Sequence, residues 1–138
     1  MKIKELKYTE LNNILDEEVE DFSGKVKIDM ENIEGKIDFS HVKFGYVEEK
    51  TVLSDFSVSV RSGHKIALVG ATGSGKTTIV NLLLRFYDIN SGSIKIDGVD
   101  IFDISKEDLR NLISIVLQDP VLFKDTIENN VRYGKLDA

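Results

Sequence analysis

The sequence predicts an α/β fold that includes a small antiparallel sheet, and three features of its patterning lead to this expectation. Short, mostly apolar runs at residues 65–69 and 113–117 are typical of buried parallel strands. Apolar and polar residues alternate through much of residues 37–60, as in strands with one exposed face. Helix-like patterns at residues 78–85 and 105–112 alternate with the strand-like runs, as they do in α/β domains.

The composition is that of a globular protein, and it excludes several kinds of site. The 138 residues are 41% hydrophobic, which is enough for the core of one domain. Without cysteine the chain has no disulfide, thiolate zinc site or cysteine nucleophile, and neither His41 nor His64 has a metal-ligating residue at short spacing. No apolar run approaches the ~20 residues that cross a bilayer, and the N-terminus has no signal-peptide pattern, so a soluble chain is expected.

The negative charge is concentrated near the N-terminus. The net charge is −6, of which residues 1–35 carry −5 and residues 36–138 carry −1. A nucleic-acid partner is not expected, because proteins that bind nucleic acid present basic surfaces. Apolar residues near a helical period predict an amphipathic helix over residues 2–20, and residues 16–35 are predicted to be an acidic, solvated linker.

Residues 36–138 begin with the alternating strands. Ile37 and Phe39 are followed by Val42 and Phe44, and the slip of one residue between the two pairs predicts a β-bulge. Further strands are expected at residues 56–60 and 92–98. A helix is expected at residues 105–112, because Ser105 followed by Asp108 three positions later is typical of a capped helix start. A last helical turn or two is expected at residues 125–131.

Residues 70–77 form a complete G-x-x-x-x-G-K-[ST] motif between a strand-like and a helix-like run. Glycine lets the backbone curl closely, so that successive N–H groups and a helix N-terminus face the phosphates of a nucleotide. Lys76 supplies a charge for the β- and γ-phosphates, and Thr77 supplies a hydroxyl for Mg²⁺. A glycine-rich turn that happens to carry Lys-Thr does not explain both flanks. The motif therefore predicts binding of a nucleoside triphosphate.

With Tyr46, this phosphate loop and Gln118 in place, residues 36–138 resemble the nucleotide-binding domain of ATP-binding cassette (ABC) transporters of the exporter type. Four segments carry the resemblance in the family's order, at residues 44–46, 70–78, 92–101 and 116–123. The resemblance implies a P-loop NTPase fold with an ABC-type antiparallel subdomain, and it implies ATP and Mg²⁺ as ligands. The ATP-binding residues that it implies are Tyr46, Val52, Thr72, Gly73, Ser74, Gly75, Lys76, Thr77 and Thr78.

Three of the implied roles have an ordinary structural alternative. Tyr46 matches the aromatic residue that stacks on adenine in this family, and a tyrosine packed at a strand end is the alternative. Val52 contacts the same ring or is a core valine. Gln118 resembles the glutamine that reaches Mg²⁺ and the attacking water, which makes it the candidate catalytic residue and, with Thr77, a candidate metal ligand; a solvent-exposed glutamine is the alternative.

The resemblance also implies partners in a longer parent protein. Residues 122–134 resemble an exporter loop that faces the membrane domain, with Asn129 where the family generally has Glu. Residues 1–35 match the cytoplasmic extension of the last transmembrane helix and the linker after it. The implied partners are that membrane domain and a second nucleotide-binding domain placed head to tail, at the cytoplasmic face of the cell membrane. Asp97 and Asp100 match turn positions and are expected to be structural.

The family's Leu-Ser-Gly-Gly-Gln signature, Asp-Glu strand and switch histidine do not occur in the sequence. An incomplete domain is therefore expected, in which residues 65–69 and 113–117 lack the strand between them. This fragment is expected to bind nucleotide without turnover, since Glu128 lies away from the phosphate site and no other group polarises water. The alternatives are an active transport ATPase, a regulatory module that holds ATP, a remnant without binding, and a small kinase.

Overall fold

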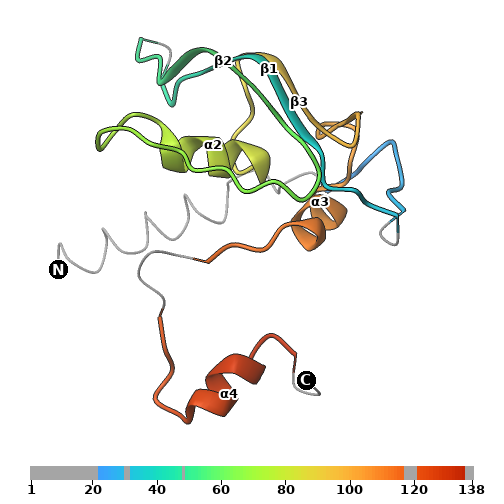
Figure 1. Ribbon diagram of the computed structural model, residues 1–138, viewed down its shortest axis with the longest axis vertical. Coiled ribbons are helices and arrows are strands. Elements are labelled where there is room, and N and C mark those ends of the chain that lie inside the picture. The colour runs from blue at the N-terminus through green and yellow to red at the C-terminus, as the bar shows by residue number, and fades with distance from the viewer. Residues whose placement is uncertain (1–21, 30–31, 48, 117–120, 136–138) are drawn as a thin grey trace, which may run out of the picture.

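The computed structural model describes residues 22–29, 32–47, 49–116 and 121–135. Two predicted features, the helix over residues 2–20 and the site residue Gln118, lie outside these ranges. Within them, no helix is long and apolar enough to span a membrane. The elements in chain order are β1 (Ile37–Phe44), β2 (Leu53–Val60), α2 (Lys76–Leu83), β3 (Ser91–Ile96), β4 (Val99–Asp100), α3 (Lys106–Leu112) and α4 (Ile127–Arg132) (Figure 1).

The four strands form one antiparallel sheet in the order β2-β1-β3-β4. The predicted bulge is confirmed, because the pairing of β1 with β2 shifts register between Phe39 and Val42 and again between Val42 and Phe44. His41 lies in this irregular stretch with a φ of 50°. On β3, Gly92 approaches the carbonyl oxygen of His41 so closely that no Cβ would fit between them. A glycine on one strand thus accommodates the bulge on the next.

The core lies between the sheet and the two helices α2 and α3, which run beneath it in Figure 1. Each helix buries one apolar stripe, through Leu82 in α2 and Leu109 in α3, and both of these side chains are fully buried. Strands β1 and β3 contribute the facing side chains. The buried cluster consists of Phe39, Val42, Phe44, Leu53, Leu82, Ile94, Ile96, Ile101, Ile104 and Leu109.

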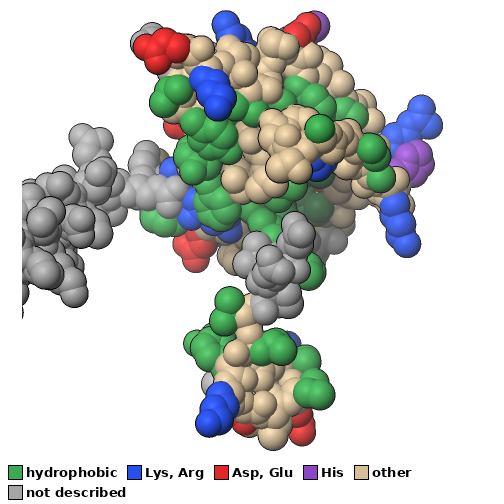
Figure 2. All heavy atoms as spheres, turned by 90° about the vertical axis from the view of Figure 1, so that its left-hand side faces the viewer, with side chains coloured by type: hydrophobic (Ala, Val, Ile, Leu, Met, Phe, Trp, Pro, Cys, Tyr) green, Lys and Arg blue, Asp and Glu red, His purple; other side chains and the backbone are tan. Residues whose placement is uncertain are grey.

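Two helix starts are fixed by side-chain caps. Ser105 caps α3 as the sequence predicts, since its hydroxyl accepts a hydrogen bond of 3.0 Å from the N–H of Asp108. Thr126 caps α4 in the same way with the N–H of Asn129 at 3.1 Å. Helix α4 has no buried residue and lies apart from the sheet (Figure 1). Hydrophobic side chains cover part of the lobe that residues 121–135 form in Figure 2, and its exposed large hydrophobic residues are Val121, Leu122, Phe123, Ile127, Val131 and Tyr133.

The parallel strands predicted at residues 65–69 and 113–117 are not formed where the structure describes these segments. Val69 and Val116 are each 93% exposed. A buried parallel strand needs neighbours that bond its N–H and C=O groups and elements that cover its faces. The apolar pattern suits such a strand, but no described strand lies beside either segment. The two strand predictions are therefore wrong for this structure.

The acidic segment before β1 is not a freely solvated linker over the residues that the structure describes. The N–H groups of Lys25 and Val26 both donate to the Asp103 carbonyl oxygen, at 2.8 and 2.9 Å, and the Lys25 amine lies 3.0 Å from the Asp103 carboxylate. Val26 also forms a parallel bridge with Ile104. Ile28 packs against the core. Backbone pairing and apolar burial thus attach the segment to the domain, which charge composition alone does not reveal.

Asp97 attaches the end of this segment to the turn between β3 and β4. Its carboxylate accepts hydrogen bonds from the N–H groups of Glu34, Gly35 and Lys36 at 2.9, 3.1 and 2.7 Å. Burial by itself raises the pKa of the Asp97 carboxyl, but the hydrogen bonds from Lys36, Gly35 and Glu34 together outweigh it and hold the pKa below the ordinary value of 3.8. Asp97 is therefore structural, as the sequence predicts.

The change Asp97→Asn is expected to lower the free energy of unfolding by about 1 kcal/mol near neutral pH, because three backbone donors lose a charged acceptor that solvent partly screens. Since the folded pKa is lowered, the carboxylate stabilises the fold fully above the ordinary value of 3.8, and this contribution is lost as the pH falls through the folded pKa. Urea unfolding at about pH 7 and at about pH 3 measures both effects.

The matched control for this prediction is Asp88→Asn, which removes an exposed carboxylate that makes no hydrogen bond with any described residue. It should change the free energy of unfolding by less than about 0.5 kcal/mol. Equal effects of the two substitutions, or an Asp97→Asn effect that persists unchanged in acid, would show that the three hydrogen bonds do not stabilise the fold through the carboxylate charge.

Candidate functional site

The glycine-rich loop of residues 70–77 curls tightly before α2. Gly73 and Gly75 have φ of 84° and 89°, a region that residues with a Cβ rarely adopt. At Gly75 a Cβ would also lie 3.0 Å from Leu53 Cδ2 and 3.3 Å from Val52 Cγ1. Positive φ and close packing against the start of β2 therefore both require glycine at this position. The loop backbone thus packs against the sheet at Gly75, the N-cap residue of α2.

The N-terminus of α2 opens onto the same loop with its N–H groups unused. The first N–H groups of an α-helix have no partner within the helix. Gly75 occupies the N-cap position, no side chain caps the helix, and its first turn holds no acidic residue. These N–H groups and the positive end of the helix dipole are therefore left for an anion. The Thr77 hydroxyl likewise has no hydrogen-bond partner in the part of the chain that the structure describes.

The Lys76 amine folds back over the loop. It donates to the carbonyl oxygens of Gly70 and Ala71, both at 2.8 Å, and lies 3.4 Å from the Ser74 hydroxyl. All three acceptors are uncharged, and no carboxylate among the described residues forms an ion pair with Lys76. The Lys76 ammonium therefore lies at the loop without a described counter-charge, and it can bind an anion there.

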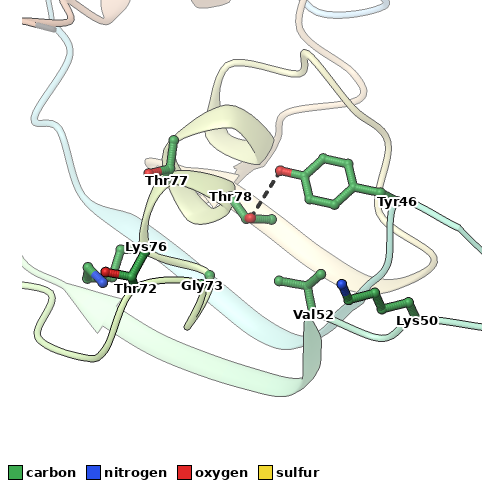
Figure 3. Close-up of a pocket in the computed structure, with 9 residues that line it drawn as sticks. Tyr46, Lys50, Val52, Thr72, Gly73, Lys76, Thr77 and Thr78 are labelled. Atoms are coloured by element: carbon green, nitrogen blue, oxygen red, sulfur yellow. Dashed lines mark hydrogen bonds between the residues drawn. The ribbon is translucent and has the colours of Figure 1, made fainter. Parts of the chain in front are cut away.

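Tyr46 forms a wall opposite the loop. Its ring makes edge-type contacts with Phe44 and Tyr87, each with ring centroids 4.9 Å apart, which fix its orientation. Its hydroxyl lies 3.1 Å from the hydroxyl of Thr78, a buried residue of α2 (Figure 3). The residue remains 49% exposed. Tyr46 is therefore held against the loop helix while a large part of its surface stays open to the cavity.

The loop, the helix start and the tyrosine enclose one open cavity of about 500 Å³, which is within the usual range for small-molecule sites. Most of the residues predicted to bind ATP line it (Figure 3). Ser74 belongs to the loop without lining the cavity, and Gln118 lies outside the described residues. The lining residues are Tyr46, Lys50, Val52, Thr72, Gly73, Gly75, Lys76, Thr77 and Thr78.

Lys50 is the lining residue that the sequence reasoning missed. The only signal was a cation four positions after Tyr46, before the strand that begins at Leu53. With Lys76 it gives the cavity two positive charges, whereas no carboxylate or histidine is among the lining residues. Nor does any group of three or more His, Cys, Asp or Glu that could hold a metal occur among the described residues. The electrostatics of the cavity suit a polyanion.

Comparison with known proteins agrees with this geometry. A family model described as ABC transporter matches residues 53–137, and this range includes the glycine-rich loop and α2. The chain belongs to the ABC transporter family. A bacterial Atm1-family ABC exporter, solved with ATP bound, superposes with a TM-score of 0.78 and 39% sequence identity, over 94% of this chain and 23% of that one. The fold is therefore that of the ABC nucleotide-binding domain, a P-loop NTPase fold.

Curated ABC relatives are similar over a small part of their length. The chain is 54% identical over 104 residues to ATP-binding cassette sub-family B member 6 of Xenopus tropicalis, covering 75% of this chain and 12% of that protein. It is 51% identical over 107 residues to the mitochondrial iron-sulfur clusters transporter ATM1 of Candida albicans, with coverages of 78% and 14%. A fatty acid ABC transporter ATP-binding/permease protein of Mycobacterium tuberculosis is 45% identical over 126 residues, with coverages of 91% and 20%.

Proposed function

We propose that the chain binds ATP with Mg²⁺ as part of the nucleotide-binding domain of an ABC exporter, in which ATP hydrolysis drives transport across a membrane. The observation that carries this proposal is one cavity that joins an uncapped helix N-terminus, a Lys76 ammonium with no ion-pair partner among the described residues, and the exposed Tyr46. Loop and helix N–H groups bind the phosphates, and Lys76 neutralises part of their charge. Tyr46 stacks on the base, with Val52 beside it on the cavity wall.

Among the residues that line the cavity, Thr77 is suited to bind the magnesium ion of a magnesium nucleotide. The Thr77 hydroxyl, in the first turn of α2, is a free oxygen ligand of the kind that Mg²⁺ accepts beside nucleotide phosphates. Bound there, the ion would neutralise charge on the phosphate oxygens. The role of Gln118 as a second ligand and as the residue that positions water stays a prediction. Thr77 orients the metal nucleotide, and the glycine loop holds its phosphates.

We propose further that this chain binds the nucleotide without turning it over. Hydrolysis needs a group that polarises or deprotonates the attacking water, for which enzymes use carboxylates or histidine. Neither residue type is among those that line the cavity. A small kinase, the other enzyme that the loop motif allows, is not favoured, because the match to the ABC transporter family covers the loop itself.

In the parent protein we place this domain at the cytoplasmic face of the membrane, paired head to tail with a second such domain. The lobe around α4 provides a surface for the membrane domain of the same exporter. Leu122, Ile127 and Val131 there are 74%, 85% and 77% exposed, more than a surface without a partner needs to leave uncovered. The lobe contains the segment whose sequence resembles the exporter loop.

Calorimetric titration with MgATP tests the proposal for this chain. Saturable binding that requires Lys76 is expected, together with phosphate release no faster than that of Lys76→Ala. Steady magnesium-dependent phosphate release that the substitution abolishes would overturn the absence of turnover. Absence of any nucleotide binding by a folded chain would overturn the proposed function.

Tyr46→Ala is expected to weaken MgATP binding by about 1–3 kcal/mol, or roughly 5- to 150-fold, because the stacking surface for the base is lost. Tyr46→Phe is the matched control, since it keeps the ring and removes only the hydroxyl that contacts Thr78. It should keep affinity within about threefold, as the net contribution of one neutral hydrogen bond is small. The same loss of affinity in both variants would contradict stacking. Titration calorimetry with a thermal melt of each variant provides the measurement.

A further inference from the structure

The base end of the cavity contains a cation that the proposed function does not use. Lys50 lies in the short connection between β1 and β2, which closes on itself through an antiparallel bridge between Val47 and Lys50 and a hydrogen bond of 3.1 Å from the Lys50 N–H to the Val47 carbonyl oxygen. Gly45 passes so close to the Lys50 carbonyl oxygen that no Cβ would fit. The backbone from which this side chain extends is therefore fixed two residues before Val52.

The Lys50 side chain extends along the wall that Tyr46 and Val52 form. Figure 3 shows its amino group directed toward Val52, below the Tyr46 ring. Lys50 forms no ion pair or hydrogen bond through its amine with any residue that the structure describes. The ammonium is thus an uncommitted donor beside the surface on which a base would stack.

A lysine at this place can distinguish between purine bases, because it donates hydrogen bonds to the base edge and accepts none. Its ammonium has three donors and no acceptor. Guanine presents two adjacent acceptors, O6 and N7, and lysine or arginine is their usual partner, whereas adenine presents N7 beside the N6 amino donor and is read by asparagine or glutamine. The side chains that line this cavity include no amide and no carboxylate. The Thr78 hydroxyl is already engaged with Tyr46.

We propose that the site accepts guanosine triphosphate at least as well as ATP, and that Lys50 is the residue that sets this preference by donating to O6 and N7 of the base. The inference rests on the proposed function, because it assumes that a triphosphate occupies the loop and its base stacks on Tyr46. Stacking on a tyrosine ring tolerates any base, so the donor at the base edge decides between purines.

Titrations of the chain with MgATP, MgGTP and the magnesium complex of inosine triphosphate test this. Inosine triphosphate carries the O6 and N7 acceptors of guanine without its amino group, so it reports on those two atoms alone. The expected result is that GTP and inosine triphosphate bind at least as tightly as ATP. Lys50→Met should weaken both relative to ATP by about 5-fold, the low end for a base-edge contact because the amine is exposed.

Lys43→Met is the matched control, because it removes the same charge from an exposed position that does not line the cavity. It should leave the ratio of the three affinities unchanged. Binding of ATP that is tighter than that of both other nucleotides, beyond the error of the titrations, would overturn the inference while leaving the proposed function intact. An equal loss of affinity for all three nucleotides in Lys50→Met would also overturn the inference, because Lys50 would then act on the phosphates that the three share. Binding of none of the three would overturn the proposed function and the base preference together.

Discussion

Lys76→Ala is expected to weaken MgATP binding by about 10- to 150-fold, an effect at least as large as that of any other substitution considered for ligand binding. A hydrogen bond to a charged group contributes about 1.5–3 kcal/mol, and the lysine amine supplies such bonds to the terminal phosphates. The amine now lies 2.8 Å from two loop carbonyl oxygens, so it is already at the phosphate end of the cavity. Titration calorimetry at fixed ionic strength gives the affinities, since screening weakens exposed charge pairs.

The control must separate the local contact from the loss of a positive charge. Lys65→Ala removes an exposed lysine from the segment that leads into the loop without lining the cavity. It should alter affinity by less than about twofold, because exposed charges farther away are screened by salt. If the two variants weaken binding equally, Lys76 acts only through the net charge of the chain. The proposal that its amine contacts the phosphates directly is then wrong. Thermal melts of both variants confirm that the loop substitution leaves the chain folded.

Ile94→Ala is expected to lower the free energy of unfolding by about 2–5 kcal/mol, the largest effect of a single substitution on stability among those considered. Ile94 is fully buried at the centre of β3, where it pairs across from Phe39 of β1. Removing three methyl or methylene carbons leaves a cavity that close-packed neighbours fill only in part. Urea unfolding followed by circular dichroism measures the change.

Lys95→Ala, one position along the same strand, is the matched control. Successive side chains of a strand point to opposite faces, and Lys95 is exposed where Ile94 is buried. The control should shift the free energy of unfolding by less than about 0.5 kcal/mol. A comparable loss in both variants would mean that β3 contributes through its backbone rather than through the apolar face toward α2 and α3.

Features that depend on neighbours in sequence were predictable. The Ser105 cap of α3 and the bulge in β1 were predicted correctly, because each arises from a few adjacent residues. The glycine loop before α2 was equally clear, since phosphate binding demands those residue types in that order. The resemblance to the ABC family, through Tyr46 and the loop, gave the fold class that the family match then confirmed.

Features that depend on distant residues were not predictable from pattern alone. Residues 65–69 have the composition of a buried strand, yet a strand forms only beside another strand, and none is described there. The segment that begins at Lys25 has a linker-like charge but pairs with Asp103, 78 positions away. Lys50 shows no pattern of its own, and only the closing of its turn against Gly45 brings it to the cavity.

The amino-acid sequence alone determined the chemistry of the phosphate end of the site. That end is formed by residues that follow one another in the chain, namely glycines that tolerate positive φ, a lysine and a threonine. The base end was decided by tertiary structure. Tyr46 and Thr78 are 32 positions apart, and their hydroxyls meet only because the sheet carries β1 over α2. Local backbone geometry is encoded by adjacent residues, whereas the shape and charge of a cavity wall arise when packing brings separate segments together.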